Sequence, residues 1–403
     1  MSFNHFNLDS RLQAGIDHLG YITPTAIQSA AIPPALAGQD LIGTAQTGTG
    51  KTAAFVLPIL NRLLNGPRGR VRALIVTPTR ELAEQIHENI RDLARGTRLR
   101  SATIYGGVSP EPQLRALRDG VEILVACPGR LLDHIEQGNV RLDGVEVLVL
   151  DEADRMFDMG FLPSVKRILK YVPASRQTML FSATFPAEVE QLASQSLRQP
   201  KRIAIGISRP VQTVTHALFP VPQHLKAGLL LEILKQTDTA SVLIFTRTRH
   251  RAHRLTQQIA RAGYRVTSLH SDRTQGQRQA ALNGFKNGTY QIMVATDIAA
   301  RGLDVESISH VINFDMPDTA DAYIHRIGRT GRAERTGDAF TLCTPDDGDL
   351  IRSLEKILGA PLRRQTLHDF DYTAPPPPST TARPGARQAP PAPVRPVRRQ
   401  ARF

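Results

Sequence analysis

Short runs of apolar residues, many of them β-branched, recur between amphipathic stretches along this chain. The runs are "ALIVTP", "EILVACP", "EVLVLDEAD" and "TMLFSAT" in the first half, and "SVLIFT", "QIMVATD" and "HVINFD" in the second. Strands that are apolar at every position are buried on both faces, which is typical of a parallel sheet covered by helices. The sequence therefore predicts the α/β fold class, with a parallel sheet in each half.

The length of the chain sets the number of domains. Its 403 residues exceed the size up to which one hydrophobic core keeps growing, so two domains are expected. The stretch "ISRPVQTVTH", residues 207–216, has no helical periodicity; Gly206 directly precedes it and Pro210 lies within it. We predict an N-terminal domain over residues 1–206, a linker over 207–216 and a C-terminal domain over 217–373.

Residues 374–403 differ in composition from the rest of the chain. They are rich in Pro and Arg and contain no acidic residue, so they are predicted to be a disordered basic tail that buries no core. The formal charge is +13, which indicates a polyanionic partner without distinguishing RNA, DNA or an acidic membrane surface. The tail either adds salt-sensitive attachment to RNA or serves as a solubilising extension.

The cysteines and the N-terminus bear on the cellular compartment. Cys127 and Cys343 lie far apart, with no Cys or His nearby in ligand spacing, which argues against a disulfide framework or a structural zinc site. The N-terminus lacks the pattern of a signal peptide, and no later run of about 18 apolar residues follows. We expect a soluble, cytoplasmic protein with no membrane partner.

The segment "AQTGTGKT", which begins at Ala45, follows the strand-like "DLIGT" and precedes the helix-like "AAFVLPILNRLL". Gly48 and Gly50 allow backbone N–H groups to surround a phosphate at a helix start. Lys51 suits the outer phosphates, and the Thr52 hydroxyl suits magnesium. This order of elements predicts a nucleotide site, and the alternative is a glycine-rich turn that arose by chance.

The strand-like run "VEVLVLDEADRM" ends in three acids, Asp151, Glu152 and Asp154. Clustered carboxylates repel one another unless a cation is near, and a divalent metal with phosphate ligands is one such cation. In phosphate-loop ATPases a carboxylate in this place completes the magnesium site, and an adjacent acid orients the attacking water. Asp151 and Glu152 suit these two roles. The alternative is an acidic surface loop.

These motifs, together with "SAT" at Ser182 to Thr184, resemble those of the DEAD-box ATP-dependent RNA helicases of superfamily 2. Further matches follow in the family's order: "GYITPTAIQ", "PTREL", "GG", "ATDIAARGLD" and "HRIGRTGR". The likeness covers about residues 3–370, and the sequence of the motifs is similar to that of bacterial members of the RhlE-like subgroup. The resemblance implies two tandem RecA-like domains, with ATP and Mg²⁺ in the cleft between them and RNA lying across both.

The resemblance also implies how the nucleotide is held. Gln28 would read the adenine edge and Phe6 would stack on the base, whereas the alternatives are a helix surface residue and a core anchor. Asp304 would hold the ribose. The implied ATP-binding residues are Phe6, Gln28, Ala45, Gln46, Thr47, Gly48, Thr49, Gly50, Lys51, Thr52 and Asp304.

The segment "HRIGRTGR" carries arginines at three-residue spacing, and the planar, bidentate guanidinium group suits phosphate. The resemblance makes Arg329 and Arg332 fingers onto the γ-phosphate, so the implied catalytic residues are Lys51, Asp151, Glu152, Arg329 and Arg332. The alternative is a basic surface helix. The implied coupling residues are Ser182, Thr184, His325 and Arg326, although a hydroxyl pair after a strand also suits a helix cap.

RNA contacts are expected from backbone amides, hydroxyls and arginines aimed at phosphate and ribose, because a remodelling motor must ignore sequence. Two positions depart from the family pattern: Cys127 replaces a usual Thr, and Ser271 replaces a usual Gly. A thiol is a weaker donor than a hydroxyl. The implied RNA-binding residues are Pro78, Thr79, Arg80, Gly107, Gly129, Arg130, Arg247, Thr296 and Gly302.

The predicted function is an RNA-dependent ATPase that locally unwinds or remodels RNA through ATP-driven closure of its domains. Two alternatives stay open from the sequence. One is an ATP-gated RNA clamp or annealing factor, and the other is a DNA translocase on the same fold. Proteins of ribosome assembly or RNA decay fit as further partners.

Overall fold

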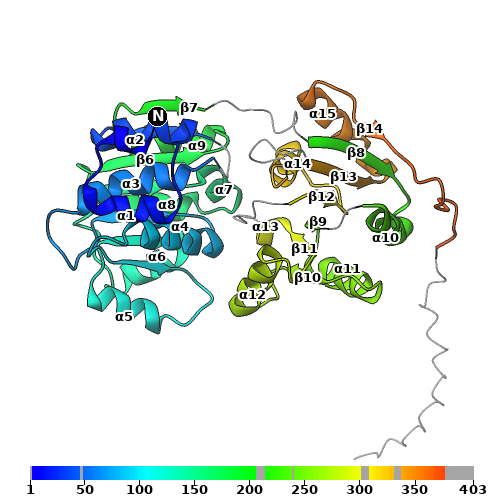
Figure 1. Ribbon diagram of the computed structural model, residues 1–403, viewed down its shortest axis with the longest axis horizontal. Coiled ribbons are helices and arrows are strands. Elements are labelled where there is room, and N and C mark those ends of the chain that lie inside the picture. The colour runs from blue at the N-terminus through cyan, green and yellow to red at the C-terminus, as the bar shows by residue number, and fades with distance from the viewer. Residues whose placement is uncertain are drawn as a thin grey trace, which may run out of the picture.

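The computed structural model describes residues 2–45, 49–205, 214–237, 240–300, 308–330 and 337–376. It contains two α/β domains, with the N-terminal domain on the left of Figure 1 and the C-terminal domain on the right. Each domain is built on its own seven-stranded sheet, and every strand pair in both sheets is parallel. The expected fold class is confirmed.

The N-terminal sheet has the strand order β3-β4-β2-β5-β6-β1-β7. Its strands alternate between two cores: Val147 and Val149 point into one hydrophobic cluster, and Leu148 and Leu150 point into the other. Burial on both faces explains why these runs are apolar at every position. The strands are β1 (Leu41–Thr44), β2 (Ala73–Val76), β3 (Ser101–Ile104), β4 (Ile123–Ala126), β5 (Val147–Leu150), β6 (Gln177–Ser182) and β7 (Lys201–Ala204).

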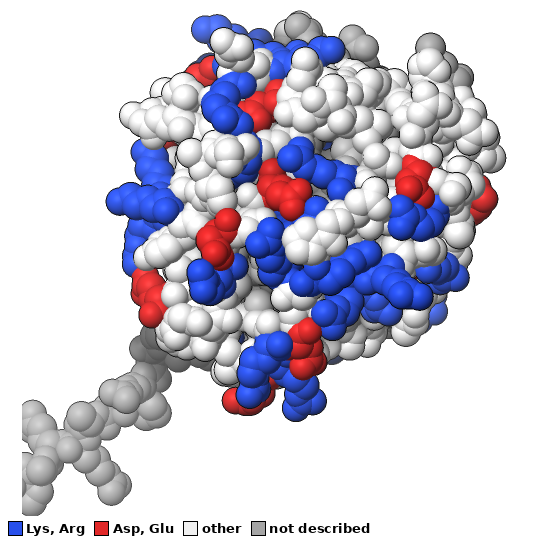
Figure 2. Space-filling model, turned by 90° about the vertical axis from the view of Figure 1, so that its left-hand side faces the viewer, with Lys and Arg blue, Asp and Glu red and all other residues white. Residues whose placement is uncertain are grey.

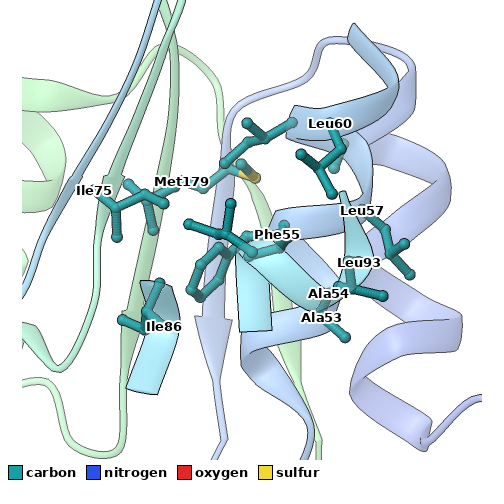
Figure 3. Close-up of a cluster of buried hydrophobic side chains, with 14 of the residues drawn as sticks. Ala53, Ala54, Phe55, Leu57, Leu60, Ile75, Ile86, Leu93 and Met179 are labelled. Carbon is teal, nitrogen blue, oxygen red and sulfur yellow. The ribbon is translucent and has the colours of Figure 1, made fainter. Parts of the chain in front are cut away.

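Helices cover both faces of this sheet. Figure 3 shows Phe55 and Leu60 packed beside Met179 and Ile75 on one face, where Phe55 is fully buried. The helices of that face are α1 (Gln13–His18), α2 (Ala26–Leu36), α3 (Lys51–Leu63) and α4 (Arg80–Leu93). Those that contribute to the second core are α5 (Glu111–Asp119), α6 (Pro128–Glu136), α7 (Ala153–Asp158), α8 (Leu162–Ile168) and α9 (Ala187–Ser196).

The C-terminal sheet has the order β10-β11-β9-β12-β13-β8-β14. Adding seven to each strand number of the first sheet reproduces this order, so the two domains share one topology. The sequence showed only that the halves are alike in architecture. The strands are β8 (Val214–Pro220), β9 (Val242–Thr246), β10 (Val266–Leu269), β11 (Ile292–Thr296), β12 (His310–Asn313), β13 (Gly337–Cys343) and β14 (Arg363–Arg364).

Helices also cover both faces of the second sheet. Ile244 and Val294 belong to the core that contains residues of α10 (Lys226–Gln236) and α11 (Arg249–Arg261). Leu243 and Met293 point to the opposite face. The helices of that face are α12 (Gln275–Lys286), α13 (Asp297–Ala300), α14 (Ala320–Ile327) and α15 (Gly348–Leu358).

The segment after α15 completes the second domain. Strand β14 pairs with β8 at the edge of the sheet, and Phe370 and Tyr372 pack against the core beside α10. The backbone carbonyl of Ala374 lies 2.7 Å from His224 Nε2, so the chain still contacts the domain at the first residue of the expected tail. Residues 377–403 lie outside the described part of the chain.

The structure moves one limit of the expected linker. The last three residues of the expected linker, Val214, Thr215 and His216, form the start of β8 and pair with Gly337, Asp338 and Ala339 of β13. The rest of the linker, residues 207–213, lies outside the described residues. Among the helices that are described, none has the length and apolar character needed to cross a membrane.

Candidate active site and RNA groove

Most of the residues singled out in the sequence follow the carboxyl ends of strands in the two sheets. In open parallel sheets this edge is where ligands bind. The two domains together line a cleft of about 140 Å³. Its lining comprises Thr44, Ala45, Lys51, Glu152, Asp154, Arg155, Ala183, Thr184 and Ile205 of the first domain, and Ile324, His325, Gly328 and Arg329 of the second.

The phosphate-loop segment joins β1 to α3. Gly50 caps the helix with a left-handed backbone, φ 88°, and an added Cβ there would lie 2.5 Å from Gln28 Nε2, so only glycine fits. Lys51 opens the helix, is buried, and donates from Nζ to the Ala45 carbonyl at 2.9 Å. Gln46, Thr47 and Gly48 lie outside the described residues.

The segment around Gln28 contacts the second half of this loop. Gln28 Oε1 accepts from the Thr25 amide at 2.9 Å, and Gln28 Nε2 donates to the Gly50 carbonyl at 3.2 Å. Thr25 Oγ1 donates to the Thr49 carbonyl at 2.8 Å. Gln28 is 4% exposed, so the alternative of an ordinary helix surface residue is wrong.

Phe6 belongs to the hydrophobic core of the N-terminal domain. It lies in the short 3-10 helix Phe3–Phe6, is 8% exposed, and meets the Phe3 ring edge-on at 5.7 Å between centroids. Phe3 in turn stacks on Tyr21 at 5.6 Å. This burial fits the alternative that the sequence left open, in which Phe6 anchors the core.

The acids after β5 lie buried at the cleft. Burial raises the pKa of Asp151 to about 6, Lys51 opposes that rise, and the neighbouring Glu152 adds to it. Glu152 has a left-handed backbone, φ 53°, which is uncommon for a residue with a side chain. Its Oε2 accepts from Arg155 Nη1 at 2.8 Å, and both side chains are almost fully buried. The alternative of a solvated acidic loop is therefore wrong.

Asp154 joins the acidic segment to the "SAT" segment. Its Oδ2 accepts from the amides of Ala183 and Thr184 at 3.1 and 2.9 Å, and from Thr184 Oγ1 at 3.1 Å. In return Ser182 Oγ accepts from the Asp154 amide at 3.1 Å. The two hydroxyls therefore bind the acidic segment rather than cap the next helix, and they join the two segments directly.

The second domain presents α14 and the turn after it to the cleft, where His325 of the helix and Arg329 of the turn are among the lining residues. Arg326 faces inward instead. It donates to Asp297 at 2.6 Å from both Nε and Nη2, and from Nη1 to Asn313 Oδ1 at 3.0 Å and to the Asp315 carbonyl at 2.7 Å. It therefore fixes α14 on its own domain. Arg332 and Asp304 lie outside the described residues.

A second and larger hollow, of about 550 Å³, lies between the domains at the same edge; we call it the groove. An added Cβ at Gly107 would meet the Arg80 guanidinium at 2.2 Å, so glycine there lets that side chain lie close. The groove is lined by Pro78, Thr79, Arg80, Glu81, Gly106, Cys127, Gly129, Arg130, Met159 and Phe161 of the first domain, and by Arg247, Arg249, Ser271, Arg273, Arg278, Thr296 and Ala299 of the second.

The groove includes most of the residues expected to contact RNA. Gly107 lies beside it through its contact with Arg80, whereas Gly302 falls outside the described residues. Burial raises the pKa of the Cys127 thiol to about 12, so this group stays protonated. The backbone amide of Arg247 donates to Asp315 Oδ2 at 2.8 Å, which holds this residue in place at the groove.

One ion pair crosses the groove from domain to domain. Arg278 of α12 approaches Glu81 of α4 through Nε at 2.8 Å and through Nη2 at 2.7 Å. Sequence reasoning missed both residues, as it missed Arg155 and Asp297. The signal for Arg155 was available, since an acid three residues before an arginine on a helix suggests an ion pair.

Two family models match this chain. The DEAD/DEAH box helicase model matches residues 25–192, and the helicase conserved C-terminal domain model matches residues 225–334. Together they span more than half of the sequence, and the matched regions carry most of the cleft and groove residues. The chain belongs to the DEAD-box family of ATP-dependent RNA helicases.

Individual relatives agree with this assignment. The chain is 46% identical over 342 residues to the RNA helicase CrhR of Synechocystis, covering 84% of this chain and 69% of that protein. It is 40% identical over 357 residues to the DEAD-box ATP-dependent RNA helicase CshA of Bacillus subtilis, covering 88% and 72%. Saccharomyces cerevisiae Dbp5 bound to RNA and ADP BeF3 matches with a TM-score of 0.79 and 28% identity, covering 90% and 95%.

Proposed function

We propose that this protein is an RNA-dependent ATPase that unwinds or remodels short RNA duplexes and RNA–protein complexes by closing its two domains on ATP and RNA. The observation that carries this proposal is the cleft itself, because residues of both domains line it. Neither domain alone contains both Lys51 and Arg329. Hydrolysis therefore depends on the domain arrangement, and a ligand that favours closure favours turnover.

ATP is assigned to the cleft. The amides of the phosphate loop and Lys51 bind the phosphates, with Gln28 and Phe6 toward the base and Asp304 toward the ribose. Glu152 orients the attacking water, while Arg329 and Arg332 stabilise charge on the γ-phosphate, a role worth about 10³–10⁵ in rate in related enzymes. The Arg155 contact positions the Glu152 carboxylate before substrate arrives.

Magnesium suits the donors at the same place. Asp151 supplies a carboxylate and Thr52 a hydroxyl, and oxygen ligands of this kind are those that Mg²⁺ prefers. Burial is the main cause of the raised pKa of Asp151, and a divalent cation would offset both this effect and the added repulsion from Glu152. When bound, the ion neutralises phosphate charge.

RNA is assigned to the groove, where its arginines meet phosphates and backbone amides meet ribose without reading the bases. Pro78, Thr79, Gly129, Arg130 and Thr296 share this role with Arg80, Gly107, Arg247 and Gly302. Asp154, Ser182 and Thr184 transmit the nucleotide state to the groove, helped by His325 and Arg326. Closure bends one strand, which a duplex cannot follow, so strands separate locally.

We also propose a subgroup, a compartment, domain limits and partners for this protein. The sequence of the motifs supports the RhlE-like subgroup. The two free, buried cysteines suit a reducing cytoplasm. The domains span residues 1–206 and 217–373, with the three residues before 217 already in β8. The basic tail attaches structured RNA, and proteins of ribosome assembly or RNA decay are the protein partners we expect.

The test is duplex release with a labelled RNA. The full chain is expected to free the strand with ATP and not with a non-hydrolysable analogue, and RNA is expected to raise the rate of ATP hydrolysis. Binding in both nucleotide states with little strand release would instead indicate an ATP-gated clamp. Equal stimulation by a matched DNA strand would indicate a DNA translocase.

A further inference from the structure

The amino edge of the N-terminal sheet, at the far end of the strands from the cleft, carries a cluster of arginines. Glu122, whose side chain is 1% exposed, organises this edge. Its carboxylate accepts from the Gly69 amide at 2.7 Å and from the Arg100 amide at 2.8 Å. One buried acid therefore holds the loop before β2 beside the segment before β3. We call Arg68, Arg70, Arg98, Arg100 and Arg141 the arginine surface.

Most of the charge on this surface is not neutralised locally. Arg70, Arg98 and Arg100 are exposed and form no ion pair with any described residue. Arg68 lies 3.7 Å from Glu122, and Arg141 lies 3.0 Å from Asp143. Figure 2, which looks onto the outer face of the N-terminal domain, shows Lys and Arg side chains gathered in a band across that face.

A pocket lies within this surface. It has a volume of about 360 Å³, and its polar lining comes from Arg70, Asn139, Arg141 and Asp143 together with glycine backbone at Gly69 and Gly144. Glycine at these places lets a ligand approach the main chain closely. The Arg70 side chain lies over Gly144, where an added Cβ would sit 3.3 Å from its Nε. Arg141 is paired with Asp143 in this pocket at 3.0 Å, so the Arg70 guanidinium is the group that suits a phosphate there.

Helix α4 connects this surface to the groove. Its first residue, Arg80, lines the groove, and its last turn leads into the segment of Arg98 and Arg100. Fourteen residues at about 1.5 Å each make this helix roughly 20 Å long. An RNA that continues from the groove along α4 needs about six base pairs, at ~3.4 Å each, to bring its phosphates to the arginine surface.

We propose that the arginine surface is a second RNA-binding surface, which holds the phosphate backbone of a duplex or strand that extends beyond the groove. This proposal rests on the assignment of the groove to RNA. Planar guanidinium groups bind phosphate in a bidentate manner and read no sequence. The surface would keep a structured RNA attached next to the strand on which the two domains act.

The test compares two RNAs on the full chain. One is a single strand of about ten nucleotides that fills the groove, and the other is the same strand joined to a duplex of about ten base pairs, which exceeds the ~20 Å length of α4. Arg70→Gln with Arg100→Gln is expected to weaken binding of the extended RNA by roughly tenfold and to flatten its log–log salt slope by about two. Binding of the short strand should stay unchanged.

The matched control is Arg261→Gln with Lys286→Gln, which removes two charges from exposed helix ends of the C-terminal domain. If both double variants weaken the extended RNA equally, the effect is bulk charge and the proposal is overturned. Equal weakening of short and extended RNA, or no weakening at all, overturns it too. Arg98→Gln with Arg141→Gln should repeat the result independently.

RNA-stimulated ATPase of the unaltered protein is measured alongside. Stimulation by the short strand tests the groove and the proposed function without involving the arginine surface. If stimulation is seen and the double variant binds extended RNA normally, only the second surface fails. If the unaltered protein shows no stimulation, the proposed function fails first.

Discussion

Arg278 of the second domain donates to Glu81 of the first at 2.8 Å, across the groove assigned to RNA. Both side chains are largely buried, 13% and 6% exposed, although they belong to different domains. Removing one partner of a buried ion pair leaves a charge without compensation, at a cost of about 3–5 kcal/mol. In a variant that lacks one partner, the two domains avoid this cost by moving apart, because water then solvates the remaining charge.

Glu81→Gln is therefore expected to shift the free protein toward separated domains. Energy transfer between dyes placed on the two domains would measure the shift, and the charge swap of Glu81→Arg with Arg278→Glu should restore the original distribution. Glu88→Gln, an exposed acid on the same helix, is the control. An unchanged distribution in Glu81→Gln would show that this pair does not hold the domains together.

Glu152→Gln should reduce ATP hydrolysis by about 10²–10⁴, because the amide is a poor proton acceptor for the attacking water. ATP and RNA binding should persist, since the side chain keeps its size. Steady-state hydrolysis and nucleotide-dependent RNA binding check the two halves of the prediction. Exposed Glu188→Gln is the control, and near-normal turnover in Glu152→Gln would remove Glu152 from the mechanism.

Thr184→Val should loosen the link between the nucleotide cleft and strand separation. It removes the bond from Oγ1 to Asp154 and leaves the two backbone amides in place. A loss of about 1 kcal/mol corresponds to roughly fivefold fewer strands released per ATP hydrolysed. Both rates should be measured in one reaction, with Thr184→Ser as the variant that keeps the hydroxyl. An unchanged ratio would contradict the coupling role.

The Cys127 thiol should resist alkylation in the folded protein up to high pH. Burial raises its pKa from 9.0 to about 12, so the folded state holds the proton more tightly than the unfolded state. The corresponding contribution to the free energy of unfolding is complete below pH 9 and is lost between about pH 9 and 12. Alkylation of a Cys343→Ala variant against pH measures this. A native reaction midpoint near pH 9 would contradict it.

Truncation after residue 376 should flatten the salt dependence of RNA affinity and leave ATPase at saturating RNA nearly intact. This cut keeps Phe370 and Tyr372, which pack on the domain, and removes a stretch with six arginines. At ~0.7 per phosphate contact on a single strand, the log–log slope falls by up to about four. An unaltered slope and affinity would leave the tail as a solubilising extension.

The sequence predicted the strands and the fold class because burial on both faces leaves a local mark, an apolar run without alternation. Because each apolar run ends abruptly, the sequence also predicted which residues directly follow a strand. The shared strand order and the start of β8 at Val214 depend on pairing with β13, more than a hundred residues away, which no local pattern records.

Other parts of the site depend on contacts that are also distant in sequence. Glu81 and Arg278 are separated by 197 residues, so neither suggests the other. Phe6 is predicted to stack on the base, and this stays a prediction, because neither its aromatic character nor its 8% exposure distinguishes a core residue from a ligand contact. Arg326 was grouped with its neighbours in the motif, whereas its four hydrogen bonds hold it inside its own domain.

Strand β14 has a consequence for how the protein behaves at high concentration. Without it, β8 would be the edge strand of the second sheet, and its unpaired backbone groups could pair with a strand of another molecule, which is how sheets aggregate. With it, the outermost strand consists of two exposed residues, Arg363 and Arg364. An edge this short and positively charged disfavours pairing with the same edge of a second molecule, so β14 protects the β8 side of the second sheet.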